Sequence, residues 1–214
     1  MPARLPISVA TAPTRRPGHA SLTAAFGLAL AVMVSLATGL WQPARAATLP
    51  ALQAVPAVDL NRYMGTWYQV ALYPNSFQKQ CVSGTRADYA LRDDGTVTVV
   101  NTCRTADGSP STAIGQARIK QPRLLGVPVG PGVTSKLEVR FAPGYLAWLP
   151  FVWAPYWVIQ LPDDHRYSVV SEPSRTYLWI LSRTPQLTPE DQAQILGTLT
   201  QQGFDTSKLV FEPQ

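Results

Sequence analysis

Apolar and polar residues alternate with a period of two over most of the chain after residue 65, the pattern of β-strands with one buried face. The clearest case is 136–141, where three apolar residues alternate with three charged ones. Residues 92–95, Arg-Asp-Asp-Gly, are typical of a hairpin turn between two such strands. The pattern predicts eight strands, at 67–72, 85–91, 96–101, 111–120, 136–141, 156–161, 167–171 and 176–183.

One helix is predicted after the last of these strands. Thr188 is a suitable N-cap, and Pro189 suits the first helical position. Ile195 and Leu199 form an apolar stripe, and Gly203 ends the helix. A short strand at 209–211 then closes the chain.

Eight antiparallel strands in chain order, linked by hairpins and followed by a helix, predict an all-β fold. We expect an eight-stranded up-and-down antiparallel barrel with one C-terminal α-helix packed outside it, because closure removes exposed strand edges. A barrel of eight strands has room inside for packed side chains or for one small ligand. A sandwich of the same strands is the structural alternative.

The first 46 residues have the features of a secretory signal. Arg15 and Arg16 precede an apolar stretch at 20–41, and Ala44-Arg45-Ala46 provides a small-residue cleavage site. We therefore predict a signal peptide at 1–46, an N-terminal extension at 47–58 and the barrel domain at 59–214. An uncleaved membrane anchor and twin-arginine export are the alternatives. The expected location is the periplasm, alone or in association with the outer membrane.

The formal net charge of +5 comes mostly from the predicted signal. Residues 1–46 hold four Arg and no acidic residue, so 14 of the 18 basic residues remain against 13 acidic ones. A net charge of +1 does not favour binding to a phosphate backbone. We expect no nucleic-acid partner.

The mature chain has two cysteines, Cys81 and Cys103, and one histidine, His165. In an oxidising compartment, an isolated cysteine pair predicts a disulfide, and two buried free thiols are the alternative. These three residues are too few for a closed zinc site. His165 lies in a polar turn, which is more typical of a solvated than of a catalytic histidine. We expect no metal, no cofactor and no catalytic residues.

The expected register of the hairpin sets a geometric condition for the disulfide. If Leu91 faces Thr96, then Cys81 lies ~10 Å along the strand from the residue opposite Cys103. A disulfide needs Cα atoms within ~7 Å. A bulge, or a fold-back of the chain before Ser83, must therefore bring the two cysteines together.

Three stretches carry a family resemblance. Residues 61–68 contain Gly65-Thr66-Trp67-Tyr68, residues 89–97 form the hairpin, and residues 177–185 contain Arg183. In this order and at these spacings, the chain resembles the lipocalin family, of calycin type, and specifically its bacterial branch, from about residue 59 to 211. It differs at 162–164, where Pro-Asp-Asp replaces a common Thr-Asp-Tyr. It also lacks a cysteine near the cleavage site, so the lipoprotein anchor of many bacterial members is not expected here.

The resemblance implies a structural role for three residues at the barrel base. In lipocalins the tryptophan closes one end of the barrel and the arginine packs on its face. Carried over, Gly65, Trp67 and Arg183 form this base, with a cation–π contact worth ~1–2 kcal/mol.

The expected inward positions of Trp67 and Arg183 determine which other residues face inward, since inward positions are two apart along a strand. The expected lining is apolar and suits an acyl chain or another elongated apolar molecule. The resemblance implies a carrier that stores or transports fatty acids or lysophospholipids, with a role in membrane maintenance. A lipocalin-fold enzyme of isomerase type and a filled barrel that acts as an interaction module are the alternatives. The predicted ligand-binding residues are Tyr89, Val97, Val99, Leu137, Val139, Phe141, Trp157, Ile159 and Trp179.

The segment 142–155 has no charge and four aromatic residues. Strand counting places it at the open end of the barrel, and such an apolar surface loop is unusual. A lid over the cavity, a rim that touches a membrane and a dimer contact are the three interpretations. The expected partners are thus a hydrophobic ligand and a membrane contacted peripherally through 142–155, with the protein a monomer or weak dimer.

Overall fold

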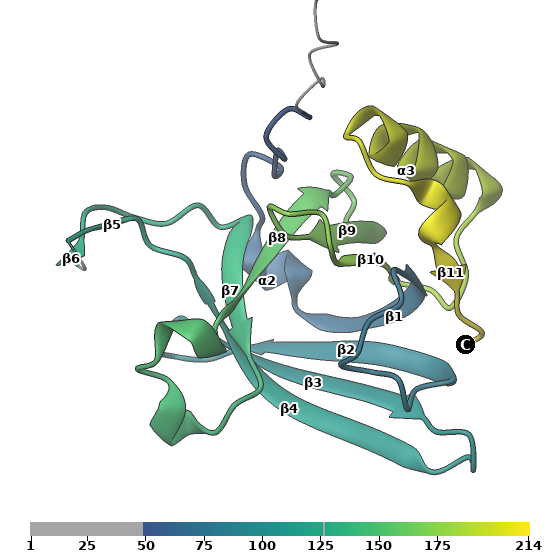
Figure 1. Ribbon diagram of the computed structural model, residues 1–214, viewed down its shortest axis with the longest axis horizontal. Helices are drawn as coiled ribbons and strands as arrows, with labels where there is room; N and C mark the ends of the chain where they lie inside the picture. Colours follow the sequence, from purple (N-terminus) through teal and green to yellow (C-terminus); the bar gives the residue numbers. More distant parts are fainter. Residues whose placement is uncertain (1–48, 126) are drawn as a thin grey trace, which may run out of the picture. The chain divides into compact units, whose positions relative to one another are not determined.

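The main sheet closes on itself, because its first strand, β1 (Gly65–Leu72), pairs with its last long strand, β10 (Leu178–Ser182). The computed structural model describes residues 49–125 and 127–214. Between β1 and β10, all neighbouring strands pair antiparallel in chain order. They are β2 (Ser83–Leu91), β3 (Val97–Arg104), β4 (Pro110–Ile119), β7 (Lys136–Arg140), β8 (Ala154–Gln160) and β9 (Tyr167–Ser171). The predicted up-and-down barrel is confirmed, and the sandwich is not formed (Figure 1).

The remaining elements decorate the barrel. The connection from β4 to β7 forms a two-stranded hairpin of β5 (Arg123–Leu124) and β6 (Val127–Pro128), which projects from the barrel (Figure 1). The strand β11 (Val210–Phe211) pairs with β1. The short helices are α2 (Leu60–Tyr63), η1 (Gly144–Leu146), η2 (Pro150–Val152) and η3 (Thr206–Lys208).

Most of the predicted strands have the expected positions, with ends shifted by one to three residues. The largest difference is β3, which was expected at 96–101 and continues to Arg104. The hairpin register also differs, because Leu91 pairs with Val97 and not with Thr96. The predicted signal peptide, 1–46, lies outside the described residues. The extension is packed where it is described: Leu52 and Val58 are buried, and the Val55 amide donates to the Val158 carbonyl at 2.9 Å.

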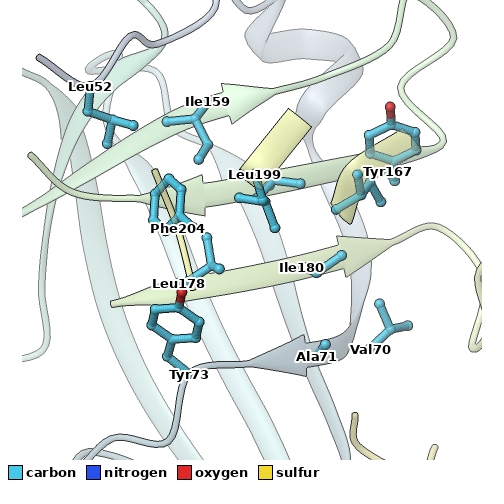
Figure 2. Close-up of a cluster of buried hydrophobic side chains, with 12 residues drawn as sticks. Leu52, Val70, Ala71, Tyr73, Ile159, Tyr167, Leu178, Ile180, Leu199 and Phe204 are labelled. Carbon is cyan, nitrogen blue, oxygen red and sulfur yellow. The ribbon is translucent and has the colours of Figure 1, made fainter. Parts of the chain in front are cut away.

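The predicted outer helix is α3 (Pro189–Gln201). The Thr188 hydroxyl accepts from the Asp191 amide at 3.1 Å, which caps the first turn. Ile195 and Leu199 are fully buried against the outer face of β1, β8, β9 and β10 (Figure 2). The outer core of the protein is therefore a helix-on-sheet layer, outside the barrel. Its members are Leu52, Val70, Ala71, Tyr73, Ile159, Tyr167, Val169, Leu178, Ile180, Ile195, Leu199 and Phe204.

Two bulges in the sheet enlarge this outer layer. The register of β1 shifts between Gln69 and Ala71, and the register of β8 shifts between Val158 and Gln160. A bulge inserts one residue and changes the inward–outward alternation beyond it. Val70 and Ala71 therefore both join the outer core. On β8, Ile159 joins it as well, and the Gln160 side chain donates to the Ile195 carbonyl in α3.

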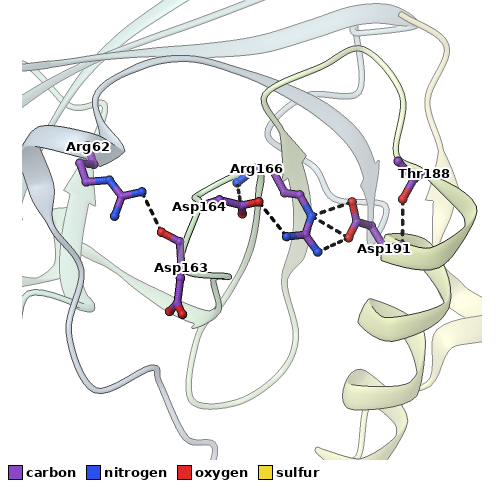
Figure 3. A network of polar contacts seen from close by, with 6 residues as sticks. All are labelled: Arg62, Asp163, Asp164, Arg166, Thr188 and Asp191. Atoms are coloured by element: carbon purple, nitrogen blue, oxygen red, sulfur yellow. Dashed lines mark hydrogen bonds and ion pairs between the residues drawn. The ribbon is translucent and has the colours of Figure 1, made fainter.

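A polar network fixes the β8–β9 connection at the closed end of the barrel (Figure 3). The Arg166 guanidinium binds both oxygens of Asp191 at the start of α3, the shortest contact being 2.6 Å, and it also pairs with Asp164 at 2.9 Å. Its hydrogen bonds hold the pKa of the Asp191 carboxyl below its usual range. Arg62 donates to the Asp163 carbonyl at 2.7 Å, which ties the residues of α2 to the same turn.

The predicted disulfide, Cys81–Cys103, is confirmed, with Cα atoms 5.5 Å apart. The chain folds back before β2, where the Cys81 amide donates to the Gln78 carbonyl at 2.9 Å. A bulge between Ser83 and Arg86 adds to the shift. The expected hairpin required either a fold-back or a bulge, and the structure contains both.

Replacing Cys81 and Cys103 together by Ala should lower the free energy of unfolding by about 3 kcal/mol, since the bond joins residues 22 apart in the sequence and restricts the unfolded chain. Urea unfolding followed by tryptophan fluorescence measures the change. Wild-type protein unfolded under reducing conditions is the control and should show the same loss. An unchanged midpoint in both samples would contradict the prediction.

Candidate functional site

The barrel encloses a cavity of about 660 Å³. Its walls come from all eight strands of the barrel, and its closed end is formed by α2 and Met64. Segments at the ends of strands, including Phe77, Gln78 and Tyr177, border its open end. Such a volume is typical of a site for one small molecule.

Seven of the nine predicted ligand-binding residues line this cavity: Tyr89, Val97, Val99, Leu137, Val139, Phe141 and Trp179. Val97, Val99 and Leu137 pack with Ala117 into one continuous apolar wall. Gly115 makes room for the Phe141 ring, because a Cβ atom at this position would lie 2.7 Å from that ring.

The assignments of Trp157 and Ile159 to the cavity were wrong. Cross-strand partners share one face of a sheet, and Tyr156 pairs with the inward Leu137, so Trp157 points outward. There, Trp157 packs on the outer core, with the Lys136 ammonium 4.4 Å from the centre of its ring. Ile159 lies in the outer core beneath α3 (Figure 2).

Sequence reasoning missed several lining residues. Leu60 and Met64, four residues apart, face the cavity from α2 and its C-cap, a helical spacing that the strand pattern did not reveal. Tyr156 lines the cavity in place of Trp157. Tyr156 is identified as a lining residue by its pairing with the inward Leu137. This strand register cannot be read from the sequence alone.

At the closed end, Trp67 is fully buried, and the Arg183 guanidinium carbon lies 3.8 Å from the centre of its ring. The Trp67 indole donates to the Tyr63 carbonyl at 2.8 Å. Arg183 donates to the carbonyls of Thr66 and Arg62, at 2.9 and 2.7 Å. The stacked pair thus joins β1, α2 and the end of β10.

The third residue of the predicted base, Gly65, has φ +90°, a conformation that L residues rarely adopt. This glycine turns the chain from α2 into β1 directly beside Arg183. Arg183 itself does not line the cavity, so the base closes the barrel without contacting the space inside it.

A chain of hydroxyl groups lies just above this base. Tyr89 contacts Tyr156 at 3.1 Å between the two oxygens, Tyr156 contacts Tyr63 at 3.0 Å, and Tyr63 contacts Ser168 at 2.8 Å. Burial raises the pKa of all three tyrosines above its usual range. All four hydroxyls therefore stay neutral at physiological pH.

The aromatic segment 142–155 folds over the outer face of the barrel. Trp153 is buried there, 3.8 Å from the Arg118 guanidinium, and its indole donates to the Ala147 carbonyl at 2.8 Å. Tyr145, Trp148 and Phe151 are 77%, 77% and 79% exposed, and none of them lines the cavity. These three rings therefore do not form a lid over the cavity.

The described residues contain no group of three or more side chains that could hold a metal ion. His165 has a buried side chain, unlike the solvated histidine that was expected, and it does not line the cavity. Among the helices of the described residues, none is long and apolar enough to span a membrane.

The fold, the closed base and the lined cavity define the lipocalin class of protein. Residues 58–214 match the profile of the lipocalin-like domain family, and the chain belongs to that family. It is 35% identical to temperature-induced lipocalin-1 from Arabidopsis thaliana, over 76% of this chain and 83% of that protein. It is also 35% identical to outer membrane lipoprotein Blc from Escherichia coli K12, over 73% of this chain and 79% of that protein.

Among solved structures, insecticyanin from the tobacco hornworm Manduca sexta superposes with a TM-score of 0.57. The two chains are 22% identical, and the match covers 77% of this chain and 85% of the other. The likeness confirms the fold.

Replacing Arg183 by Ala should lower the free energy of unfolding by about 1–3 kcal/mol, because the stacking on Trp67 and the packing of the side chain are lost. Denaturant unfolding measures the effect. Arg92→Ala is the control, since Arg92 lies on the exposed hairpin, where it pairs with Asp94 at 3.6 Å. If both variants unfold at the same denaturant concentration, the contact between Arg183 and Trp67 does not stabilise the fold.

Proposed function

We propose that this protein is a carrier of the bacterial envelope that binds and stores or transports apolar ligands, with fatty acids or lysophospholipids as the ligand class. The observation that carries the proposal is the cavity of about 660 Å³ with its apolar wall. Burying an acyl chain there contributes ~0.8 kcal/mol for each methylene group removed from water. The presence of this cavity also argues against the alternative, a barrel filled by its own side chains.

The charged residues that border the cavity are already bound to neighbours. Arg86 pairs with Asp88 at 3.3 Å, and Arg140 donates to the Gln116 side chain at 2.7 Å. Glu172 accepts from three backbone amides of its own turn, at 2.6, 2.6 and 3.2 Å. These groups leave the wall itself apolar, which favours a ligand without a charge along its length.

The enzyme alternative finds less support in the cavity. A general base needs a pKa near the working pH. The ionisable side chains at the closed end are Tyr63, Tyr89 and Tyr156, whose pKa values are raised further above neutrality by burial. The two cysteines are joined in the disulfide. A binding function therefore accounts for the lining better than a catalytic one does.

The envelope setting and a peripheral membrane contact through 142–155 complete the proposal. The name of the Escherichia coli relative assigns that protein to the outer membrane. In this chain, the exposed Tyr145, Trp148 and Phe151 have the side chains that favour membrane interfaces. Leu124 and Leu125 on the β5–β6 hairpin are also exposed, at 66% and 97%.

The groove between this hairpin and the aromatic segment adds positive charge. Arg118, Lys120 and Lys136 line it, together with Asp94 and with Glu138, which pairs with both Arg118 and Lys120. A basic surface between two apolar projections suits anionic headgroups, and each Lys or Arg near such a surface contributes ~1 kcal/mol.

The delipidated wild-type protein should bind a fluorescent acyl probe saturably, and long-chain fatty acids or lysophospholipids should displace it. Trp179 lines the cavity, so binding should quench tryptophan emission. Val139→Asp should abolish binding, because an unpaired carboxylate in the apolar wall costs several kcal/mol. Ile114→Asp is the matched control: Ile114 is 68% exposed on the neighbouring strand and should leave binding unchanged. No saturable binding by the wild type would refute the carrier.

Replacing Trp148 and Phe151 together by Ser should abolish association with vesicles that contain an anionic phospholipid, while affinity for free acyl ligand stays unchanged. Vesicle co-sedimentation and probe titration measure the two properties separately. Ile114→Ser removes an equally exposed apolar side chain elsewhere and should keep vesicle association. If the double variant sediments with vesicles as the wild type does, the membrane contact is not made by this segment.

A further inference from the structure

The hydroxyl chain at the closed end points to a more specific ligand than an apolar wall alone would select. We propose that the cavity selects ligands that carry an uncharged hydrogen-bond acceptor, such as a ketone or ester carbonyl oxygen, on the end that enters first, and that the Tyr89 hydroxyl donates to it. This inference rests on the proposed carrier function. Within the broad class of apolar ligands, it favours those with such an oxygen over acyl chains that enter with a terminal methyl group.

Counting protons shows that one donor is left over. The four hydroxyls of Tyr89, Tyr156, Tyr63 and Ser168 carry four protons, and three hydrogen bonds join them. Three protons lie within the chain of contacts. The fourth proton belongs to one of the four hydroxyls. An inner hydroxyl, Tyr156 or Tyr63, that kept it would have to accept two hydrogen bonds and turn its own proton away from both neighbours, so an end of the chain is the favoured place for it.

The two ends are not equivalent. Ser168 is fully buried, and within the described part of the protein its hydroxyl contacts only Tyr63. A proton directed away from Tyr63 at that end would be a buried donor without a partner, which costs ~1–3 kcal/mol. Tyr89 lines the cavity, where a ligand can accept its proton.

The favourable direction thus runs from Ser168 through Tyr63 and Tyr156 to Tyr89. All four hydroxyls then donate one hydrogen bond once a ligand accepts the proton of Tyr89, and the three tyrosines each accept one; such chains strengthen their members by mutual polarisation. An alcohol that acts as donor toward Tyr89 would reverse the chain and leave the Ser168 proton unpaired. The arrangement therefore favours an acceptor over a donor on the ligand.

The ligand end that meets Tyr89 should also be uncharged. The aromatic rings of Tyr63 and Tyr89 stack with centres 5.9 Å apart, and the apolar Leu60 and Met64 flank them. The cation in this region, Arg183, lies behind Trp67 and outside the cavity lining. A carboxylate would lose its hydration there without gaining a paired cation, whereas a ketone or ester oxygen loses little.

A matched pair of ligands tests the inference: undecyl methyl ketone and the alkene in which a methylene group replaces its carbonyl oxygen. Each displaces a fluorescent acyl probe from the wild type and from Tyr89→Phe. The variant should weaken the ketone about fivefold to tenfold and leave the alkene unchanged. Tyr156→Phe should weaken the ketone less, because Tyr89 keeps its own proton and loses the polarising neighbour.

Tyr68→Phe is the matched control, since Tyr68 follows Trp67 on β1 and does not line the cavity. It should change neither affinity. If both ligands bind and Tyr89→Phe weakens them equally or not at all, the acceptor selection is overturned while the carrier function stands. If neither ligand binds the wild type, the carrier function and the inference fall together.

Discussion

The closure of β1 onto β10 is the constraint on which the rest of the structure depends, and the stacking of Arg183 on Trp67 is its side-chain counterpart. Trp67 comes from the first strand, and Arg183 directly follows the last one. Their contact, together with the bonds from Arg183 to the carbonyls of Thr66 and Arg62, seals one end of the barrel. This base closes that end of the barrel, and the cavity lies above it.

A barrel with a hollow interior needs another source of hydrophobic stabilisation, and the outer layer supplies it. The bulges in β1 and β8 turn extra apolar residues outward, where Ile195 and Leu199 of α3 cover them. Burying such side chains contributes roughly 1.5–3 kcal/mol each. The inner wall therefore does not have to supply most of the hydrophobic core, and its apolar surface remains available to a ligand.

Local pattern predicted the barrel because alternation, turn residues and the helix cap are all encoded within a few neighbouring residues. The inner face of β7 followed directly from its alternation with charged residues. Trp157 and Ile159 were misassigned, since the phase of β8 depends on its pairing with β7 and on a bulge. These are non-local features that a single strand does not state. The hydroxyl chain was missed for the same reason, because its members come from α2, β2, β8 and β9.

The packing of one side chain, Trp153, fixes the position of the whole aromatic segment. Its sequence is compatible with a lid, and it begins at the open end of the barrel. However, Trp153 lies between Arg118 and Arg140 on the outer face, with guanidinium carbons 3.8 and 5.2 Å from its ring centre. A cation–π contact of this kind contributes ~0.5–2 kcal/mol and holds the loop against the barrel wall. The remaining rings are thus directed to the outside while the cavity entrance stays free of them, an arrangement in which a surface contact and ligand entry can occur at the same time.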